Sequence, residues 1–138
     1  MLFRSVFLGG GTPSILEGDE TARIFHALSE DFDISPDAEI TMEVNPGTVS
    51  AEKAETWKAC GVNRLSIGLQ SADDRELKML GRIHTFEAFL DTWGIVRRAG
   101  FDNVNIDLIS ALPGQTPEGW EKTLHAAAEL DQIGRAHV

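Results

Sequence analysis

Three stretches of the chain alternate apolar and polar residues with a period of two, which is the period of a half-buried β-strand. They are Glu39–Asn45, Arg64–Gln70 and Asn103–Ile109. A shorter apolar run, Ser5–Leu8, precedes them and ends at a triple glycine. Longer segments lie between these stretches, and their apolar residues recur every three to four positions, which predicts helices. The pattern as a whole predicts β-α-β-α-β-α-β-α.

Residues that favour helix starts bound the helical segments. Ser50, Thr85 and Thr116 each stand where an N-cap is expected, directly before a helical pattern. Ser71, with an acidic residue three positions on, resembles a capping box for a short helix. The helices are therefore predicted to follow closely on the strands, with short connections.

Strands that alternate with helices predict a parallel sheet with right-handed crossovers. Two architectures fit: an open doubly wound sheet, or part of a (β/α)8 barrel. A central strand of a doubly wound sheet is apolar on both faces, whereas the last three strands here each have one polar face. The polar positions are Thr41, Glu43 and Asn45; Arg64, Ser66, Gly68 and Gln70; and Asn103, Asn105 and Asp107. A barrel explains the pattern because polar faces converge on its lumen. A full barrel takes roughly 250 residues, so four βα units indicate a partial one.

Composition and charge narrow the classes of function. The chain has 22 acidic and 12 basic residues and a net charge of −10, which argues against a nucleic-acid partner. No apolar run reaches the roughly 20 residues of a membrane span, and the apolar N-terminus is too short for a secretory signal. The single cysteine, Cys60, allows neither an intrachain disulfide nor a cysteine metal cage. We therefore expect a cytoplasmic protein with a small-molecule ligand.

Three polar residues occupy matching positions near the carboxyl ends of successive strands: Glu43, Gln70 and Asp107. Ligand sites of barrels lie at this end. Burying such groups without partners costs roughly 1–3 kcal/mol each, so a ligand site is favoured over passive filling. The glycines at 9–11 could present bare backbone amides to a ligand or form only a tight turn. Arg82 could pair with a carboxylate or be an ordinary exposed arginine.

The spacing of the histidines, the cysteine and the acidic residues gives less support to metal binding, cysteine chemistry or acid–base catalysis. The four histidines are scattered, without the spacing of metal ligands, and Cys60 is typical of a small half-buried residue. A barrel hydrolase or aldolase could use Glu43 and Asp107 as an acid–base pair. This alternative is the weakest, because no lysine or second acid stands on a strand end beside them.

Five ordered motifs resemble one family. They are GGGTPS (9–14), EITMEVNPGTV (39–49), GVNRLSIGLQS (61–71), LGRIHT (80–85) and NIDLISALPGQT (105–116). Together they resemble the radical S-adenosylmethionine (radical SAM) family of oxygen-independent coproporphyrinogen III dehydrogenases and HemW-type heme chaperones. Within it, Asn45 and the LGRIHT string look more like the heme chaperones.

The resemblance implies a partial (β/α)6 TIM-like barrel that binds SAM and a 4Fe–4S cluster, with heme as a further candidate ligand. Matching positions assign SAM contacts to Gly10, Gly11, Thr12, Glu43, Gln70, Arg82 and Asp107. The implied function is heme handling by a chaperone in porphyrin and heme metabolism. The alternative is the oxidative decarboxylation of coproporphyrinogen III to protoporphyrinogen IX. The implied partners are heme or a porphyrinogen and heme-acceptor proteins, including membrane-bound ones, but no nucleic acid.

The chain departs from the family pattern at both ends. The family's CxxxCxxC loop, which supplies three cluster ligands, is absent, and Cys60 does not correspond to it. Residues 133–138, IGRAHV, resemble the translation of a common sequencing adapter, so we exclude this tail and assign residues 1–132 to the barrel. We expect a barrel fragment that carries no cluster and is inactive by itself.

Overall fold

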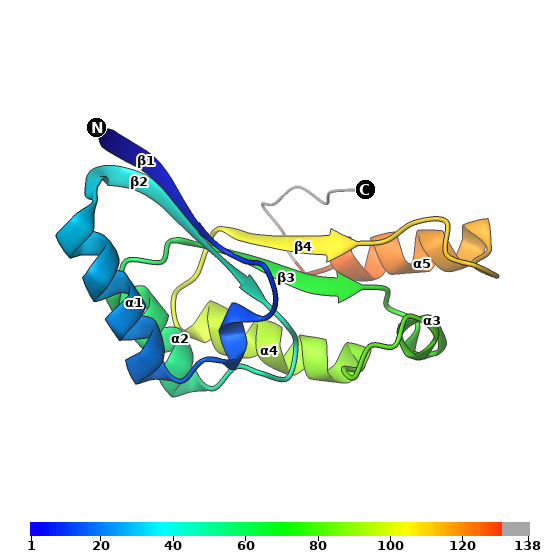
Figure 1. Ribbon diagram of the computed structural model, residues 1–138. Helices are drawn as coiled ribbons and strands as arrows, with labels where there is room; N and C mark the ends of the chain where they lie inside the picture. Colours follow the sequence, from blue (N-terminus) through cyan, green and yellow to red (C-terminus); the bar gives the residue numbers. More distant parts are fainter. Residues whose placement is uncertain (131–138) are drawn as a thin grey trace.

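A computed structural model describes residues 1–130 of the chain (Figure 1). The elements are β1 (Leu2–Leu8), the 3-10 turn η1 (Pro13–Ile15), α1 (Gly18–Asp31), β2 (Asp33–Val44), α2 (Ala51–Ala59), β3 (Arg64–Gln70), α3 (Asp74–Met79), α4 (Phe86–Arg98), β4 (Val104–Leu108) and α5 (Pro117–Ala128). The tail assigned to residues 133–138 lies outside the described residues, so the domain limits stay a prediction.

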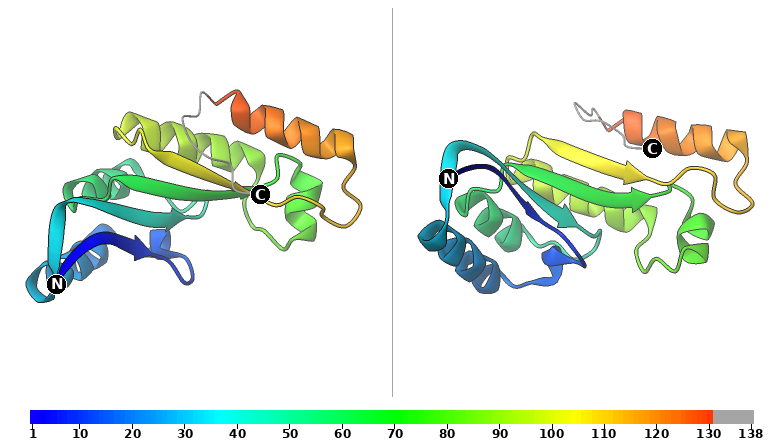
Figure 2. Two further views of the ribbon diagram at one scale, coloured as in Figure 1. Left: turned by 90° about the horizontal axis from the view of Figure 1, so that it is seen from above. Right: turned by 45° about the horizontal axis from the view of Figure 1, so that its top comes forward.

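The four strands form one parallel sheet in the order β1-β2-β3-β4. This confirms the predicted α/β fold with parallel strands, which follow one another in chain order. Helices α1, α2 and α4 cover one face of the sheet, and α5 lies beyond β4 at its edge (Figures 1 and 2). Within residues 1–130 no helix covers the opposite face (Figure 2). The fold therefore leaves one face of a twisted parallel sheet open, as a barrel segment does.

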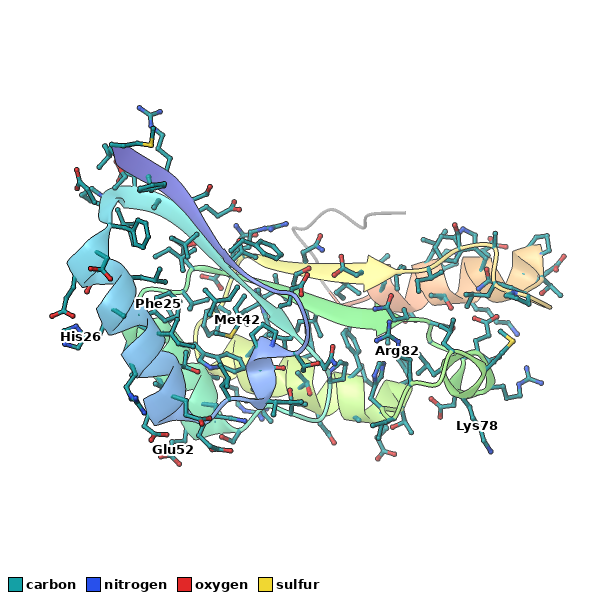
Figure 3. All side chains as sticks on the ribbon, viewed as in Figure 1. Phe25, His26, Met42, Glu52, Lys78 and Arg82 are labelled. Carbon is teal, nitrogen blue, oxygen red and sulfur yellow. The ribbon has the colours of Figure 1, made fainter. Side chains whose placement is uncertain are left out.

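The core lies between the sheet and the helices. Figure 3 shows Met42 of β2 and Phe25 of α1 in this layer, and both side chains are buried. Of the apolar strand positions predicted to face the helices, Ile40 is partly buried and packs against the core cluster, and the others are buried in it: Met42, Val44, Leu65, Ile67, Leu69, Val104, Ile106 and Leu108. Burying each such side chain stabilises the fold by about 1.5–3 kcal/mol. The period-two pattern thus fixes which face of each strand packs on the helices.

Three of the predicted N-caps are confirmed. The side chains of Ser50, Thr85 and Thr116 each accept a hydrogen bond from the backbone N–H three residues on. The capping box at Ser71 is wrong, because Asp73 caps α3 and accepts from the backbone N–H of Arg75. Ser71 is instead fully buried and its hydroxyl donates to Glu76 at 2.5 Å. This hydrogen bond links the β3–α3 connection to helix α3.

The first two strands are longer than the sequence predicts. Residues before Ser5 pair with the start of β2, and the register then shifts before it resumes at Ser5 and Glu39. The shifted segment of β2 contains Pro36, which cannot donate to a ladder and is tolerated in a strand mainly at edges and bulges. The sequence Ser35-Pro36-Asp37 therefore looks like a turn but lies inside a strand.

Candidate functional site

The polar faces of β2, β3 and β4 meet on the open side of the sheet. The strand register pairs Glu43 with Ser66 and Ser66 with Asn105. Two residues nearer the carboxyl ends, Gly68 pairs with Asp107. Because alternate residues share a face of a strand, these side chains line one surface. The predicted convergence of Glu43 and Asp107 is therefore found in the structure.

A hydrogen-bond network fixes the carboxylate of Asp107. The hydroxyl of Ser66 donates to Oδ2 at 2.7 Å, and Nδ2 of Asn105 donates to Oδ1 at 2.7 Å. Nδ2 of Asn105 also lies 3.1 Å from the Ser66 hydroxyl, to which it donates. Each oxygen of Asp107 thus has one protein donor and keeps further acceptor capacity.

Asn105 carries an unused acceptor in this network. Its side chain is 3% exposed, and its Oδ1 is buried without a hydrogen-bond partner. Leaving a buried acceptor unpaired costs about 1–3 kcal/mol. The acceptors on the open face are the carboxylates of Asp107 and Glu43, which suit a ligand that carries ammonium or hydroxyl groups.

The glycines after β1 bring backbone close to Glu43. A Cβ at Gly9 would lie 2.6 Å from the Phe7 ring and 2.9 Å from Oε2 of Glu43, so a larger residue would require these side chains to move. Gly10 and Gly11 have φ values of +81° and +141°, and a Cβ on either would meet no atom within 4 Å. The loop is therefore an exposed stretch of left-handed backbone whose amides can reach a ligand.

The next residues of the loop are anchored to the end of β2. The backbone N–H of Asn45 donates to Oγ of Ser14 at 3.0 Å, and Ser14 Oγ lies 2.6 Å from Thr48 Oγ1. Thr48 Oγ1 donates to the carbonyl of Asn45 at 2.7 Å, so its only hydrogen is used and Ser14 must donate to Thr48. These bonds form a closed ring that starts and ends on the backbone of Asn45.

Lys53 of α2 adds a second anchor. Its Nζ lies 3.1–3.2 Å from three carbonyl oxygens, those of Ser14, Ile15 and Thr48. The side chain is only 12% exposed, so these charge-assisted bonds replace water. The side chain of Asn45 completes the connection, because its Nδ2 donates to Oγ1 of Thr12 at 3.0 Å.

Gln70 and Arg82 lie around the same end of the sheet. Gln70 has a φ of +71°, a left-handed conformation that is rare outside glycine. It turns the side chain back over Gly68, where a Cβ would lie 2.8 Å from Nε2 of Gln70 and 3.8 Å from Oδ1 of Asn45. Arg82 is exposed and lies near the carboxyl end of β3 (Figure 3).

A cavity of about 500 Å³ opens between the β2–α2 connection and the α3–α4 connection. Its lining includes Thr12, Asn45 and Arg82, together with Ile15, Pro46–Thr48, Gly81, Ile83–Thr85 and Ala88. Glu43, Gln70 and Asp107 do not line it. A larger cavity of about 630 Å³ lies between α3, α4 and α5, away from all the predicted site residues.

The predicted residues therefore fall into two neighbouring groups. Glu43 and Asp107 lie on the open sheet face, and Thr12 and Arg82 line the cavity at the strand ends. Gln70 lies between the groups, over Gly68. The predicted site residues did not include Ser66, Asn105, Ser14, Thr48 or Lys53. The alternation that placed Ser66 and Asn105 on the face of Asp107 was a usable signal, whereas nothing in the pattern indicated Lys53.

Comparison with known proteins identifies the class. Residues 2–127 match the Radical SAM superfamily, and the chain belongs to that superfamily. The heme chaperone HemW of Lactococcus lactis is 42% identical over 127 residues, which cover 92% of this chain and 34% of that protein. HemW of Escherichia coli is 39% identical over 128 residues, which cover 93% of this chain and 34% of that protein. The chain thus spans about a third of the length of these relatives.

Structural similarity to a solved protein supports the same family. Coproporphyrinogen III oxidase (HemN) from Escherichia coli, a radical SAM enzyme, superimposes with a TM-score of 0.87 and 34% sequence identity. The match covers 99% of this chain and 33% of HemN. The archaeal Elp3 of Methanocaldococcus infernus, at 19% identity and a TM-score of 0.72, shares the fold. The predicted radical SAM barrel segment and the predicted family are both confirmed.

The superfamily implies SAM and a 4Fe–4S cluster as cofactors. The acceptors of the open face fit the ammonium and hydroxyl groups of SAM, and the donor amides of the glycine loop fit its carboxylate. The residues do not fit a cluster. Cys60, the single cysteine, is the C-cap of α2 and precedes β3. It therefore lies at the amino-terminal end of the strands, whereas the glycine loop lies at their carboxyl-terminal end. Within residues 1–130 no group of three or more His, Cys, Asp or Glu side chains could hold a metal ion.

In residues 1–130 no helix is both long and apolar enough to cross a bilayer.

Proposed function

We propose that this chain forms the SAM-binding part of a heme chaperone of the HemW type. The observation that supports it most directly is the open sheet face, where Glu43 and Asp107 lie beside an exposed glycine loop. The names of four curated relatives, heme chaperones at 36–42% identity, support this class of function. Heme handling, heme-acceptor partners and a cytoplasmic location belong to this proposal.

In the proposal, SAM lies across both groups of residues. Gly10, Gly11 and Thr12 contact its methionyl part through the loop. Glu43, Gln70 and Asp107 accept from or donate to its polar groups, and Arg82 pairs with its carboxylate. Two donors hold Asp107 in place before a ligand arrives, so binding requires little reordering of that side chain.

This chain alone is expected to bind SAM weakly. Each hydrogen bond to a charged group is worth about 1.5–3 kcal/mol, and 1.4 kcal/mol corresponds to a tenfold change in affinity. Without cluster ligands, the loss of only two or three such contacts lowers affinity by roughly a hundredfold or more. We therefore expect binding that is weak or undetectable.

The direct test is an NMR titration of the isotope-labelled chain with SAM. The largest shifts are expected at Gly10, Gly11 and the strand ends. The variant Glu43→Ala should weaken binding, whereas Glu52→Ala, on the outer surface of α2 (Figure 3), should not. Shifts spread evenly over the helices, or equal binding by Glu43→Ala, would contradict the assignment. Micromolar binding by the unmodified chain would show that these residues, not the cluster, dominate affinity.

Oxidative decarboxylation of coproporphyrinogen III is the second candidate, and the structural match to HemN supports it. Two chimaeras separate the candidates. In one, residues 2–127 replace the matching segment of Escherichia coli HemW, and in the other they replace that of HemN. We expect the first chimaera to bind SAM and heme and the second to lack oxidase activity. An active HemN chimaera together with a HemW chimaera that binds no heme would favour the second candidate.

A further inference from the structure

Helix α5 packs on the rest of the chain differently from the helices before it. Each of helices α1 to α4 buries at least one large apolar side chain: Phe25 in α1, Trp57 in α2, Leu77 in α3 and Phe89 in α4. The buried side chains of α5 are Thr123 and Ala127, and its Trp120 and Leu124 are only partly buried. Because large apolar side chains gain most from burial, apolar packing holds α5 less firmly than it holds the other helices.

The buried threonine of α5 is attached to the β3–α3 connection by polar contacts. The backbone N–H of Ala72 donates to Oγ1 of Thr123 at 3.2 Å. Oγ1 of Thr123 also lies 3.5 Å from Oγ of Ser71. The hydrogen of Ser71 is used by Glu76, to which Ser71 donates at 2.5 Å, so Thr123 is the donor in the longer contact.

Glu76 and Gln115 form a second attachment, which we call the latch. Nε2 of Gln115 donates at 3.0 Å to Oε2 of Glu76, the same oxygen that accepts from Ser71. Oε1 of Gln115 accepts from the backbone N–H of Leu112, with an N–O distance of 3.4 Å. Gln115 lies in the β4–α5 connection, so the latch joins this connection to helix α3.

The backbone between β4 and the latch is strained at one residue. Ala111 has a φ of +59°, which lies in the left-handed region that a residue with a Cβ rarely adopts. Before it, the backbone N–H of Ile109 donates to the carbonyl of Gln70 at 2.9 Å, and after it comes the latch. Ala111 therefore lies between a fixed strand end and a latched connection, which is where a hinge is expected.

Residues 110–128, which we call the α5 segment, form one wall of the 630 Å³ cavity. The segment contributes Gly114 and Thr123 to the lining, and the opposite wall includes Glu76 of α3 and Leu90 of α4. Because Glu76 and Thr123 both border the cavity, water there can replace their partners when the segment moves away.

We infer that the α5 segment is a movable wall of this cavity, which turns about Ala111 and is held closed by the latch between Glu76 and Gln115. Opening widens the cavity and relieves the left-handed backbone, while the sheet, α3 and α4 stay folded. The cavity lies away from the residues proposed to bind SAM, so this inference is independent of the proposed function.

Native-state amide hydrogen exchange of the unmodified chain, followed by NMR in low concentrations of urea, tests the movement. A local opening exposes less surface than global unfolding and so depends less on urea. We expect the hydrogen-bonded amides of α5 to exchange with a weaker urea dependence than those of β3 and α4. An equal urea dependence in all three elements would overturn the inference, because α5 would then open only when the whole chain unfolds.

Substitutions in the latch show what holds the segment closed. Gln115→Met keeps the length of the side chain but removes its polar atoms, so α5 should exchange about tenfold faster while α4 changes little. Lys122→Met, at an exposed position of the same helix, should leave both rates nearly unchanged. Glu76→Gln keeps an acceptor for Ser71 and Gln115 and should resemble the unmodified chain, whereas Glu76→Ala should accelerate α5. Unchanged exchange in Gln115→Met, or equal acceleration in α5 and α4, would overturn the inference.

Two substitutions at Ala111 test the hinge in opposite directions. Glycine adopts the left-handed conformation without steric cost, so Ala111→Gly should favour the closed state and slow exchange in α5 severalfold. Ala111→Val adds a β-branched side chain, which disfavours this conformation more strongly, and should speed the same exchange. Equal exchange rates in the two variants would show that the segment does not turn about Ala111.

Discussion

The hydroxyl of Ser66 donates to Asp107 at 2.7 Å, across the pair of strands β3 and β4. This bond supplies one of the two protein donors of the Asp107 carboxylate, and the other comes from Asn105. The strand register explains the contact, because Ser66 pairs with Asn105 and Asp107 lies two residues further along the same face. The sheet itself thus orients the carboxylate.

Replacing Ser66 by Ala should loosen Asp107 without removing it. A hydrogen bond to a charged group contributes about 1.5–3 kcal/mol, so the free energy of unfolding should fall by an amount in this range. SAM affinity should fall by up to about tenfold, and less than in Asp107→Ala. Urea denaturation and NMR titration measure the two effects. The control Ser29→Ala removes an exposed hydroxyl that bonds only within α1 and should change neither quantity. A SAM affinity unaffected by Ser66→Ala would show that Asp107 needs no support.

The second prediction concerns the anchor of the glycine loop. Lys53→Met keeps the length of the side chain but removes the donors to three carbonyls. Buried acceptors that lose their partner cost about 1–3 kcal/mol, so the chain should lose stability in this range. Amide hydrogen exchange in residues 9–16 should accelerate by more than in the helices. Lys78→Met, on the exposed side of α3 (Figure 3), is the matched control. Equal acceleration throughout the chain would indicate only global destabilisation.

The period of two in β2, β3 and β4 was sufficient to predict the fold, because burial on one face forces the alternation. N-caps at Ser50, Thr85 and Thr116 were also predictable, since each acts on its own helix. The N-cap at Asp73 was not predictable, because the hydroxyl of Ser71 contacts Glu76 and Thr123 of α5 and does not cap α3. That competition between distant elements is invisible to a local pattern.

The site was predictable to a similar degree. Alternation placed Glu43 and Asp107 on one face, and the resemblance to the radical SAM family added the glycine loop and Arg82. The frame around Asn45 was not predictable, because it joins Ser14 to Thr48 and Lys53, which are 34 and 39 residues away along the chain. Only the fold brings these hydroxyls and the ammonium together.

The third prediction is a pH dependence at the start of α3. Hydrogen bonds and charge from Arg75 hold the pKa of Asp73 below its usual value. Its folded pKa is thus lower than its unfolded pKa, so it stabilises the fold above the unfolded pKa of about 3.9. This contribution is lost as pH falls through the folded pKa. Because the pair is exposed, the effect should be small.

Urea denaturation at neutral and at acidic pH measures this contribution. Asp73→Asn keeps a capping oxygen but does not titrate, so the loss of stability between the two pH values should be smaller than in the unmodified chain. Asp37→Asn, at another exposed carboxyl, should leave the loss nearly unchanged. An identical pH dependence in the unmodified chain and Asp73→Asn would show that the Arg75 contact does not persist in solution.

The last prediction is that this chain assembles no 4Fe–4S cluster by itself. Burial raises the pKa of the Cys60 thiol, so less of the thiolate that binds iron is present at neutral pH. Cys60 also lies at the amino-terminal edge of β3, whereas the glycine loop lies at the carboxyl ends of the strands. After anaerobic reconstitution with iron and sulfide, the chain and its variant Cys60→Ala should therefore show equal and substoichiometric iron and no cluster absorbance. A stable cluster in the unmodified chain that is lost in Cys60→Ala would mean that several copies share their cysteines.

The HemW chimaera, in which the same residues stand within a longer relative, is expected to bind a cluster and to bind SAM more tightly than the chain alone. If it bound a cluster with no gain in SAM affinity, the cluster would not contribute to SAM binding, and the expected weakness of the chain alone would be wrong.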